Sequence, residues 1–185
     1  VLHWINAGAP MEQIAAHMEK RRRDSLERES ALDELRAATG ALVHEITGQE
    51  LGPVGLVVDY ARRDATPGAA ALAALAAEAE TLVELSFAGL AIGTAELQHL
   101  PVLPALERLH LERTRVDDDT LNLLAARAPA LRYLNLHSTA VTPEGLRALA
   151  SLAALERLIL FGTPLDELQS IRESLSHGDN LRMKT

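Results

Sequence analysis

Three segments of this chain spell almost the same phrase, and the repeat limits what the chain can fold into. The phrase L-x-x-L-x-L-x-x-T-x-(V/L) reads LERLHLERTRV from Leu106, LRYLNLHSTAV from Leu131 and LERLILFGTPL from Leu155. A looser copy, LVELSFAGLAI, starts at Leu82, so successive copies start 24, 25 and 24 residues apart. Self-similarity at a period of about 20 to 30 residues predicts a solenoid, in which each repeat packs on its neighbours.

Each copy also alternates apolar and polar residues, which predicts a strand with one buried and one exposed face. A threonine follows each of the three clear strands, and we expect its hydroxyl to hydrogen-bond the backbone of the turn. The expected inward residues are Leu85, Phe87, Leu109, Leu111, Leu134, Leu136, Leu158 and Leu160, and the turn threonines are Thr114, Thr139 and Thr163.

The whole chain predicts an α/β fold: a short right-handed solenoid with parallel strands on a concave face and helices on a convex face. We expect a helical linker or docking segment over 1–40, a strand pair and degenerate capping repeat over 41–79, the repeats over 80–165, and a capping helix and tail over 166–185. The convex helices are expected over 94–100, 120–128, 143–152 and 166–176, after which residues 177–185 fray.

The first two parts carry more detailed expectations. A charged helix runs from Met11 to about 38 with an interruption near Asp24 and Ser25, and Gly40 ends it. Strands follow over 41–46 and 54–61, and then an alanine-rich helix with Thr66 as its N-cap and Pro67 at its first position. The apolar stripe of the first helix comprises Ile14, Met18, Leu26, Leu32 and Leu35. The basic cluster over 20–23 could contact phosphate or an anionic lipid, but the acidic residues nearby favour a helix face that is exposed to water.

Composition excludes several classes of protein. A net charge of −8 argues against a general nucleic-acid binder, which needs an excess of Lys and Arg. The absence of cysteine excludes disulfides, thiolate metal sites and covalent haem attachment in this chain. No apolar run reaches the roughly 18 residues of a membrane span. Because the chain begins with Val1 and not Met, we expect a fragment or a processed product.

The outward residues of the repeats form the candidate binding site. Stacked strands lie about 4.8 Å apart, so residues at equivalent positions form columns. We expect Glu112 beside His137, and His110 beside Asn135. Four such strands give only a few hundred Å², less than the roughly 800 Å² of a specific interface, so a partner must also touch the N-terminal segment or the loops. The predicted partner-binding residues are Arg108, His110, Glu112, Tyr133, Asn135, His137, Arg157 and Phe161, with Trp4 as a docking anchor.

The polar residues of the repeats also suggest three kinds of chemistry. His110, Glu112 and His137 are a zinc- or iron-type ligand set, but a flat strand ladder splays such side chains apart. Ser138 follows His137, yet no nucleophile-elbow motif is present. The run of aspartates over 117–119 resembles a calcium cluster, but carboxylates also stabilise the start of the helix that follows. We therefore predict no catalytic residue, no metal and no cofactor in this chain.

The repeat phrases LERLHLERTRVDDDTL and LRYLNLHSTAVTPEGLRAL resemble bacterial leucine-rich repeats. VLHWINAGAP, from Val1 to Pro10, is similar to the closing helix of a bacterial c-type cytochrome domain. The order of segments resembles membrane-anchored proteins that carry a periplasmic cytochrome domain followed by such repeats. This chain lacks the C-x-x-C-H motif of that family, so the resemblance implies a periplasmic location and an electron-transfer partner, but no haem here.

These observations lead to one preferred function and two alternatives. We expect a non-catalytic protein-interaction or scaffold module on the periplasmic side, an accessory part of a membrane-bound electron-transfer complex whose partner is a cytochrome or another subunit. The first alternative is a fragment of a c-type cytochrome electron carrier or redox enzyme without its haem domain. The second is a periplasmic metal- or glycan-binding protein.

Overall fold

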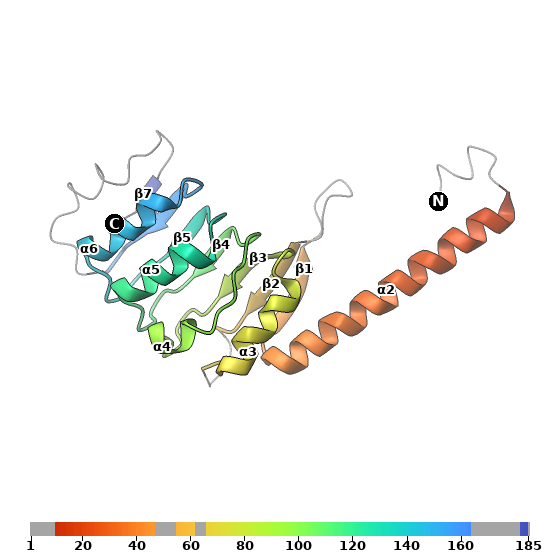
Figure 1. Ribbon diagram of the computed structural model, residues 1–185, viewed down its shortest axis with the longest axis horizontal. Coiled ribbons are helices and arrows are strands. Elements are labelled where there is room, and N and C mark those ends of the chain that lie inside the picture. The colour runs from red at the N-terminus through yellow and green to blue at the C-terminus, as the bar shows by residue number, and fades with distance from the viewer. Residues whose placement is uncertain (1–9, 47–54, 62–65, 164–181, 185) are drawn as a thin grey trace.

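The computed structural model describes residues 10–46, 55–61, 66–163 and 182–184, and it has an α/β fold built on one seven-stranded sheet (Figure 1). The strands follow each other across the sheet in chain order; β1 and β2 pair antiparallel, and all later pairs are parallel. The strands are β1 (Leu42–Ile46), β2 (Gly55–Asp59), β3 (Leu82–Ser86), β4 (Arg108–His110), β5 (Tyr133–Asn135), β6 (Arg157–Ile159) and β7 (Arg182–Lys184).

Short helices line one side of the sheet, and one long helix leads into the β1 edge (Figure 1). Each short helix connects two parallel strands, as the crossover between parallel neighbours requires. The α-helices are α2 (Met11–Thr39), α3 (Ala69–Ala73), α4 (Thr94–Leu97), α5 (Asp118–Arg127) and α6 (Pro143–Leu146); 3-10 turns η1 (Ala74–Glu78) and η2 (Arg147–Ser151) extend α3 and α6.

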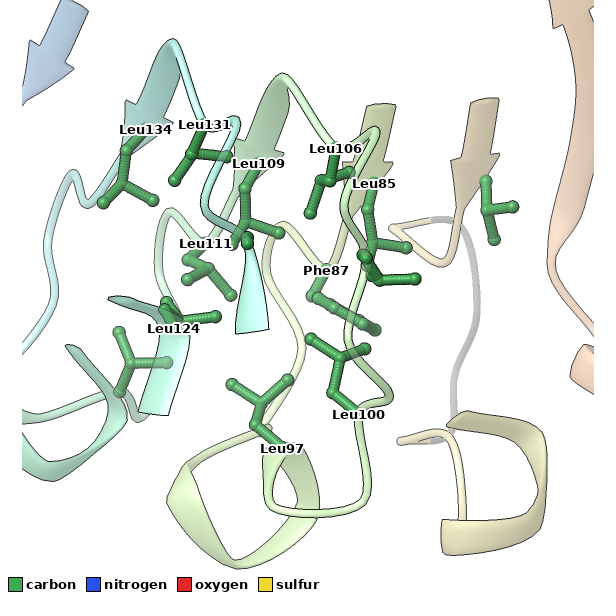
Figure 2. Packing of buried hydrophobic residues seen from close by; sticks show 14 of the residues in the cluster. Leu85, Phe87, Leu97, Leu100, Leu106, Leu109, Leu111, Leu124, Leu131 and Leu134 are labelled. Carbon is green, nitrogen blue, oxygen red and sulfur yellow. The ribbon is translucent and has the colours of Figure 1, made fainter. Parts of the chain in front are cut away.

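Leucines from strands and helices form a single core between the two layers (Figure 2). The eight residues expected to point inward are buried: Leu160 is 2% exposed and the other seven are 0%. Tyr60 and Phe87 extend this core toward β2, where their rings stack with centroids 5.1 Å apart. The predicted inward face of the repeats is therefore confirmed.

The turn threonines behave as expected from the sequence. The hydroxyl of Thr114 donates to the carbonyl of Leu111 over 2.7 Å, that of Thr139 to Leu136 over 2.8 Å, and that of Thr163 to Leu160 over 2.6 Å. Each bond satisfies a carbonyl at the point where the chain leaves its strand and cannot continue the ladder.

Two aspartates join consecutive repeats, and they start α5 earlier than expected. Asp117 is the N-cap of α5, accepting from the backbone N–H of Thr120 over 3.1 Å and from the hydroxyl of Thr94 over 2.7 Å. Asp118 accepts from the backbone N–H and the hydroxyl of Thr142, at 2.8 and 2.6 Å. The helix begins at Asp118 and not Thr120 because Asp117, two residues further back than we predicted, supplies the cap.

The long helix α2 corrects two expectations. It continues without a break past Asp24 and Ser25 and ends at Gly40, whose φ of 65° is left-handed as predicted. Ile14, Leu32 and Leu35 are buried, but Met18 and Leu26 are 54% and 58% exposed, so the apolar stripe is not continuous. Neither Asp24 nor Ser25 is a proline or glycine that would break the helix, and the flanking Arg, Glu and Leu residues favour helix.

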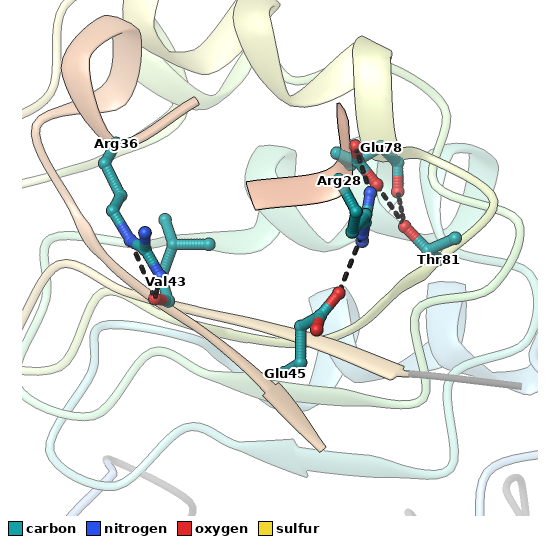
Figure 3. A network of polar contacts seen from close by, with 6 residues as sticks. All are labelled: Arg28, Arg36, Val43, Glu45, Glu78 and Thr81. Carbon is teal, nitrogen blue, oxygen red and sulfur yellow. Dashed lines mark hydrogen bonds and ion pairs between the residues drawn. The ribbon is translucent and has the colours of Figure 1, made fainter. Parts of the chain in front are cut away.

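Two arginines of α2 fasten it to the edge of the sheet (Figure 3). Arg28 bridges two carboxylates, with its Nε 2.7 Å from Glu45 of β1 and its Nη1 2.7 Å from Glu78 of η1. Arg36 donates from Nε and Nη2 to the carbonyl of Val43, at 3.2 and 3.0 Å. Unpaired backbone groups on an edge strand invite association with other chains, and Arg36 occupies one of them.

Two further expectations were wrong. Helix α3 begins at Ala69 with Gly68 as its N-cap, because Gly68 is extended and its carbonyl accepts the N–H of Leu72, while Pro67 is buried ahead of the helix. Residues 182–184, expected in a frayed tail, form β7 and pair in parallel with β6. The capping helix expected over 166–176 lies outside the described residues.

The threonine bonds should be measurable as stability. Replacing Thr139 with Val conserves volume but leaves the buried carbonyl of Leu136 without its donor, so we expect a loss of about 1 to 3 kcal/mol in the free energy of unfolding. Denaturant unfolding measures it. Ser138→Ala removes an exposed hydroxyl from the same turn and should change stability by less than about 0.5 kcal/mol. Equal effects of the two changes would contradict the prediction.

The ion pair between Arg28 and Glu78 should make the free energy of unfolding depend on pH. Burial alone would raise the pKa of the Glu78 carboxyl, but hydrogen bonds from Arg28 and Thr81 outweigh it and lower this pKa. A carboxylate with a lowered pKa stabilises the fold above its unfolded pKa, about 4.3 for Glu, and this contribution is lost as the pH falls further.

We therefore expect Arg28→Met to lose about 1 to 3 kcal/mol at neutral pH, because Glu78 keeps a buried charge without its partner. The difference between the variant and the parent should shrink between about pH 4 and pH 2. Urea titrations across that range measure it. Arg23→Met, which removes an exposed pair 4.0 Å long, serves as the control and should cost less than about 1 kcal/mol. A pH-independent difference would refute the proposed coupling.

Candidate functional site

The face of the sheet opposite the leucine core presents a regular array of side chains. Register pairs Glu84 with Arg108, Arg108 with Tyr133, and Tyr133 with Arg157. Two residues further along the strands, Ser86, His110, Asn135 and Ile159 form a second column, so the register contains two of the columns predicted for the repeats. The exposed sheet face, as we call it below, comprises Leu42, His44, Ile46, Val57, Asp59, Glu84, Ser86, Arg108, His110, Tyr133, Asn135, Arg157, Ile159, Arg182 and Lys184.

This face is wider than expected from the repeats alone, since it extends over seven strands instead of four. A depression of about 240 Å³ crosses β1 to β4 and is lined by His44, Ile46, Val57, Asp59, Glu84, Ser86 and His110. The predicted site omitted β1, β2 and β7. The pattern Arg-Met-Lys at 182–184 repeats the polar-apolar-polar order of Arg-Leu-His at 108–110, but three residues are too few to identify a strand by themselves.

Glu84 organises the centre of the face, although it was not among the predicted binding residues. Its Oε2 lies 3.1 Å from Nε of Arg108, and its Oε1 lies 3.3 Å from Nε2 of His110. The other ring nitrogen of His110 lies 3.8 Å from Glu112. The side chains of Glu84, His110 and Glu112 are only 19% to 25% exposed, so this cluster is partly shielded from water.

The expected neighbours Glu112 and His137 do not form a pair. Glu112 turns to His110 within its own repeat, while the Nδ1 of His137 lies 2.6 Å from the carbonyl of Phe161 in the next repeat. The ring centroids of His137 and Phe161 are 5.7 Å apart. Asn135 is beside His110 in the sheet, as predicted, but its Oδ1 accepts from the backbone N–H of His137.

Six of the predicted binding residues thus fall into two clusters. Arg108, His110, Glu112 and Tyr133 gather around Glu84, and His137 with Phe161 lies beyond the ends of the strands. Phe161 is 62% exposed and is the most accessible aromatic ring among the described residues. Trp4, the predicted docking anchor, lies outside the described residues.

The ring of Tyr133 lies close to both Arg108 and His110 on the exposed sheet face. The guanidinium of Arg108 lies 5.1 Å from the centroid of the Tyr133 ring, a cation–π distance, and the ring of His110 is also 5.1 Å away. Burial raises the pKa of the Tyr133 phenol, and the charge of Glu112 raises it further, while Arg108 and Arg157 lower it less. The phenol is therefore a hydrogen-bond donor across the physiological pH range.

Ser138 and His137 have the composition of a nucleophile and its base, but not the geometry. The Ser138 hydroxyl lies 3.4 Å from Nδ1 and 3.3 Å from Nε2 of His137. The in-plane bonding directions of the two nitrogens diverge, and a neutral ring has a lone pair on only one of them, so an oxygen about equally far from both is not aligned with it. Ser138 also has a φ of 54°, which the tight turn imposes. This arrangement does not activate a hydroxyl for attack.

The described part of the chain contains neither a cluster of metal ligands nor a helix that could span a membrane. Among residues 10–46, 55–61, 66–163 and 182–184, no three His, Asp or Glu side chains converge as a metal would require. Asp117 and Asp118, considered for calcium, instead accept the helix-capping bonds described above. None of the helices described here combines the length and apolar character needed to cross a bilayer.

Comparison with models of protein families and with curated proteins found no match to this chain. Its function must therefore be inferred from the exposed sheet face itself.

The environment of Tyr133 can be tested by titration. The difference in phenolate absorbance between the parent chain and Tyr133→Phe isolates this residue from Tyr60, and we expect a pKa above the ordinary value of about 10. Glu112→Gln should lower that pKa, and Arg108→Gln should raise it, because each removes a charge that acts on the phenolate. Shifts in the opposite directions would show that Tyr133 does not face these two side chains.

Proposed function

We propose that this chain is a short leucine-rich-repeat solenoid that acts as a non-catalytic protein-binding module through its exposed sheet face. The solenoid is supported by the match between the 24- to 25-residue period and the parallel register, in which equivalent residues of successive copies are direct neighbours. Such arrays present one surface per repeat on a continuous core.

The observation that carries the binding function is the contrast between the two sides of each strand. Leu109, Leu134 and Leu158 are fully buried, and the residues flanking them place Arg, Tyr, His and Asn on the opposite face. Side chains on strands of a packed core are held in place, which lowers the entropic cost of binding a partner. Tyr and Arg are also the residues that most often carry binding energy at protein interfaces.

The dimensions of the face support a partner that reaches beyond it. Seven strands spaced about 4.8 Å apart extend nearly 30 Å across, but each of β4 to β7 is only three residues long. The face remains smaller than the roughly 800 Å² per partner of a standard interface. We infer that a stable complex also uses residues beside the sheet, such as Phe161, or the exposed part of α2.

The partner and its location rest on the sequence resemblance alone. Similarity of residues 1–10 to the end of a cytochrome domain leads us to propose a periplasmic partner in a membrane electron-transfer complex. A visible spectrum of the protein purified from its native membrane provides the test. A haem absorption band that copurifies would support the proposal, and a complex without any redox cofactor would contradict it.

Two aromatic residues should separate binding from folding. Replacing Tyr133 and Phe161 with Ala should weaken capture of the native partner by at least about tenfold, since exposed aromatic anchors contribute most to such interfaces. The melting temperature should fall by no more than about 2 °C, because neither side chain belongs to the core.

Val102→Ala provides the matched control, because Val102 is 53% exposed and is not part of the exposed sheet face. Its effect on capture should be less than about twofold. Quantitative pull-down and calorimetry measure the two properties. Collapse of the fold in the double variant would show that the exposed and buried faces have been assigned the wrong way round.

A further inference from the structure

A groove with an excess of positive charge lies at one end of the exposed sheet face. It encloses about 520 Å³ and is formed by the first residues of β4 to β7 and the turns that precede the strands. Four arginines face two glutamates in it, although the chain as a whole carries a net charge of −8. The lining residues are Glu107, Arg108, Arg132, Tyr133, Glu156, Arg157 and Arg182.

The four arginines differ in whether their charge is already compensated. Arg108 pairs with Glu84 at 3.1 Å, and Arg132 pairs with Glu156. Arg157 and Arg182 are register neighbours on β6 and β7, and no carboxylate among the described residues lies within ion-pair distance of either. Like charges directly opposite each other on adjacent strands repel, so this pair gains from any anion that lies between them.

Positive charge extends along β7, the last strand of the sheet. Lys184 follows Arg182 on the exposed face of β7, where it is in register with Ile159. In contrast, Asp59 and Glu84 lie on the same face at β2 and β3. Charge therefore changes sign along the face, from carboxylates near the first strands to cations at the last two, which have no carboxylate partner among the described residues.

We propose that this groove binds the carboxylates of an acidic, extended segment of the protein partner, with Arg157 and Arg182 as the principal contacts. This proposal rests on the proposed function, and it specifies the chemistry of the partner. Guanidinium groups match carboxylates through paired N–H donors, and Tyr133, between Arg108 and Arg157, supplies a further donor.

The shape and charge of the groove favour a peptide over a nucleic acid. A polyanionic strand would meet the net negative charge of the chain and the two glutamates Glu107 and Glu156 on the groove wall. A segment with acidic side chains at alternate positions can place carboxylates beside the arginines and avoid those glutamates. The groove also spans four strands, which is more than a single small anion occupies.

The test uses the full chain and a labelled peptide of about eight residues that alternates Glu and Gly, long enough to reach from β4 to β7. Fluorescence anisotropy should show binding that is absent for the matched peptide of alternating Gln and Gly. Arg157→Gln combined with Arg182→Gln should weaken binding by at least about tenfold. Arg147→Gln removes one arginine charge on the helical side, as each of the two groove substitutions does, and should alter binding by less than about twofold.

Three results would overturn the proposal. These are equal binding by the parent and the double variant, equal weakening by Arg147→Gln, and displacement of the peptide by inorganic phosphate at the same concentration as free peptide. The last would indicate a small-anion site. Circular dichroism must show that the double variant is folded; if it is not, Arg157→Lys, which keeps the charge but loses the paired donors, should still weaken binding at least threefold.

Capture of the native partner separates this proposal from the function on which it rests. If the double arginine variant captures the partner as well as the parent, while the variant lacking Tyr133 and Phe161 does not, the groove proposal fails and the binding module stands. If the parent captures no partner but still binds the acidic peptide in a manner that requires Arg157 and Arg182, the groove is supported and the proposed scaffold function fails.

Discussion

Burial of leucine between a very short strand and a short helix is the interaction on which the rest of this structure depends. A single repeat cannot cover its own apolar residues, so Leu109 and Leu111 are shielded only when the repeats before and after them stack in parallel. Stacking sets the register, and the register places every alternate side chain on the opposite face. The arrangement of possible binding residues is thus a consequence of how the core is closed.

Arginine side chains have different surroundings at the two ends of the stacked strands. At the β1 edge, α2 brings Arg28 and Arg36 against the sheet, and they engage Glu45, Glu78 and the carbonyl of Val43. The cationic side chains at this edge therefore stabilise the fold. On the exposed face near β6 and β7, the arginines lack such partners among the described residues, so the same residue type supports stability at one end and remains available for a ligand at the other.

From this distribution of side chains we propose a protein-binding role and not catalysis. Catalysis needs a base aligned with a nucleophile, and the equal distances from Ser138 to both nitrogens of His137 do not provide one. Metal binding needs converging ligands, whereas parallel strands hold Glu112 and His137 apart in separate contacts. What the face does provide is a fixed pattern of charge and aromatic rings, which is the usual basis of specificity between proteins.

The sequence by itself determined the buried residues and the turn bonds of the repeats. Alternation and period are local signals, and they identified Leu85, Leu134 and Thr139 correctly because any repeat of this kind must bury the same positions. Which exposed side chains pair was decided only by the tertiary structure: His110 meets Glu84, and Arg157 lies beside Arg182. These contacts join residues about 25 positions apart, and the choice between Glu84 and Asn135 for His110 depends on rotamers that neighbours restrict. The strand at Arg182 was missed for a related reason, since three residues are too few for a periodic pattern, and only the open edge of β6 gives them a partner.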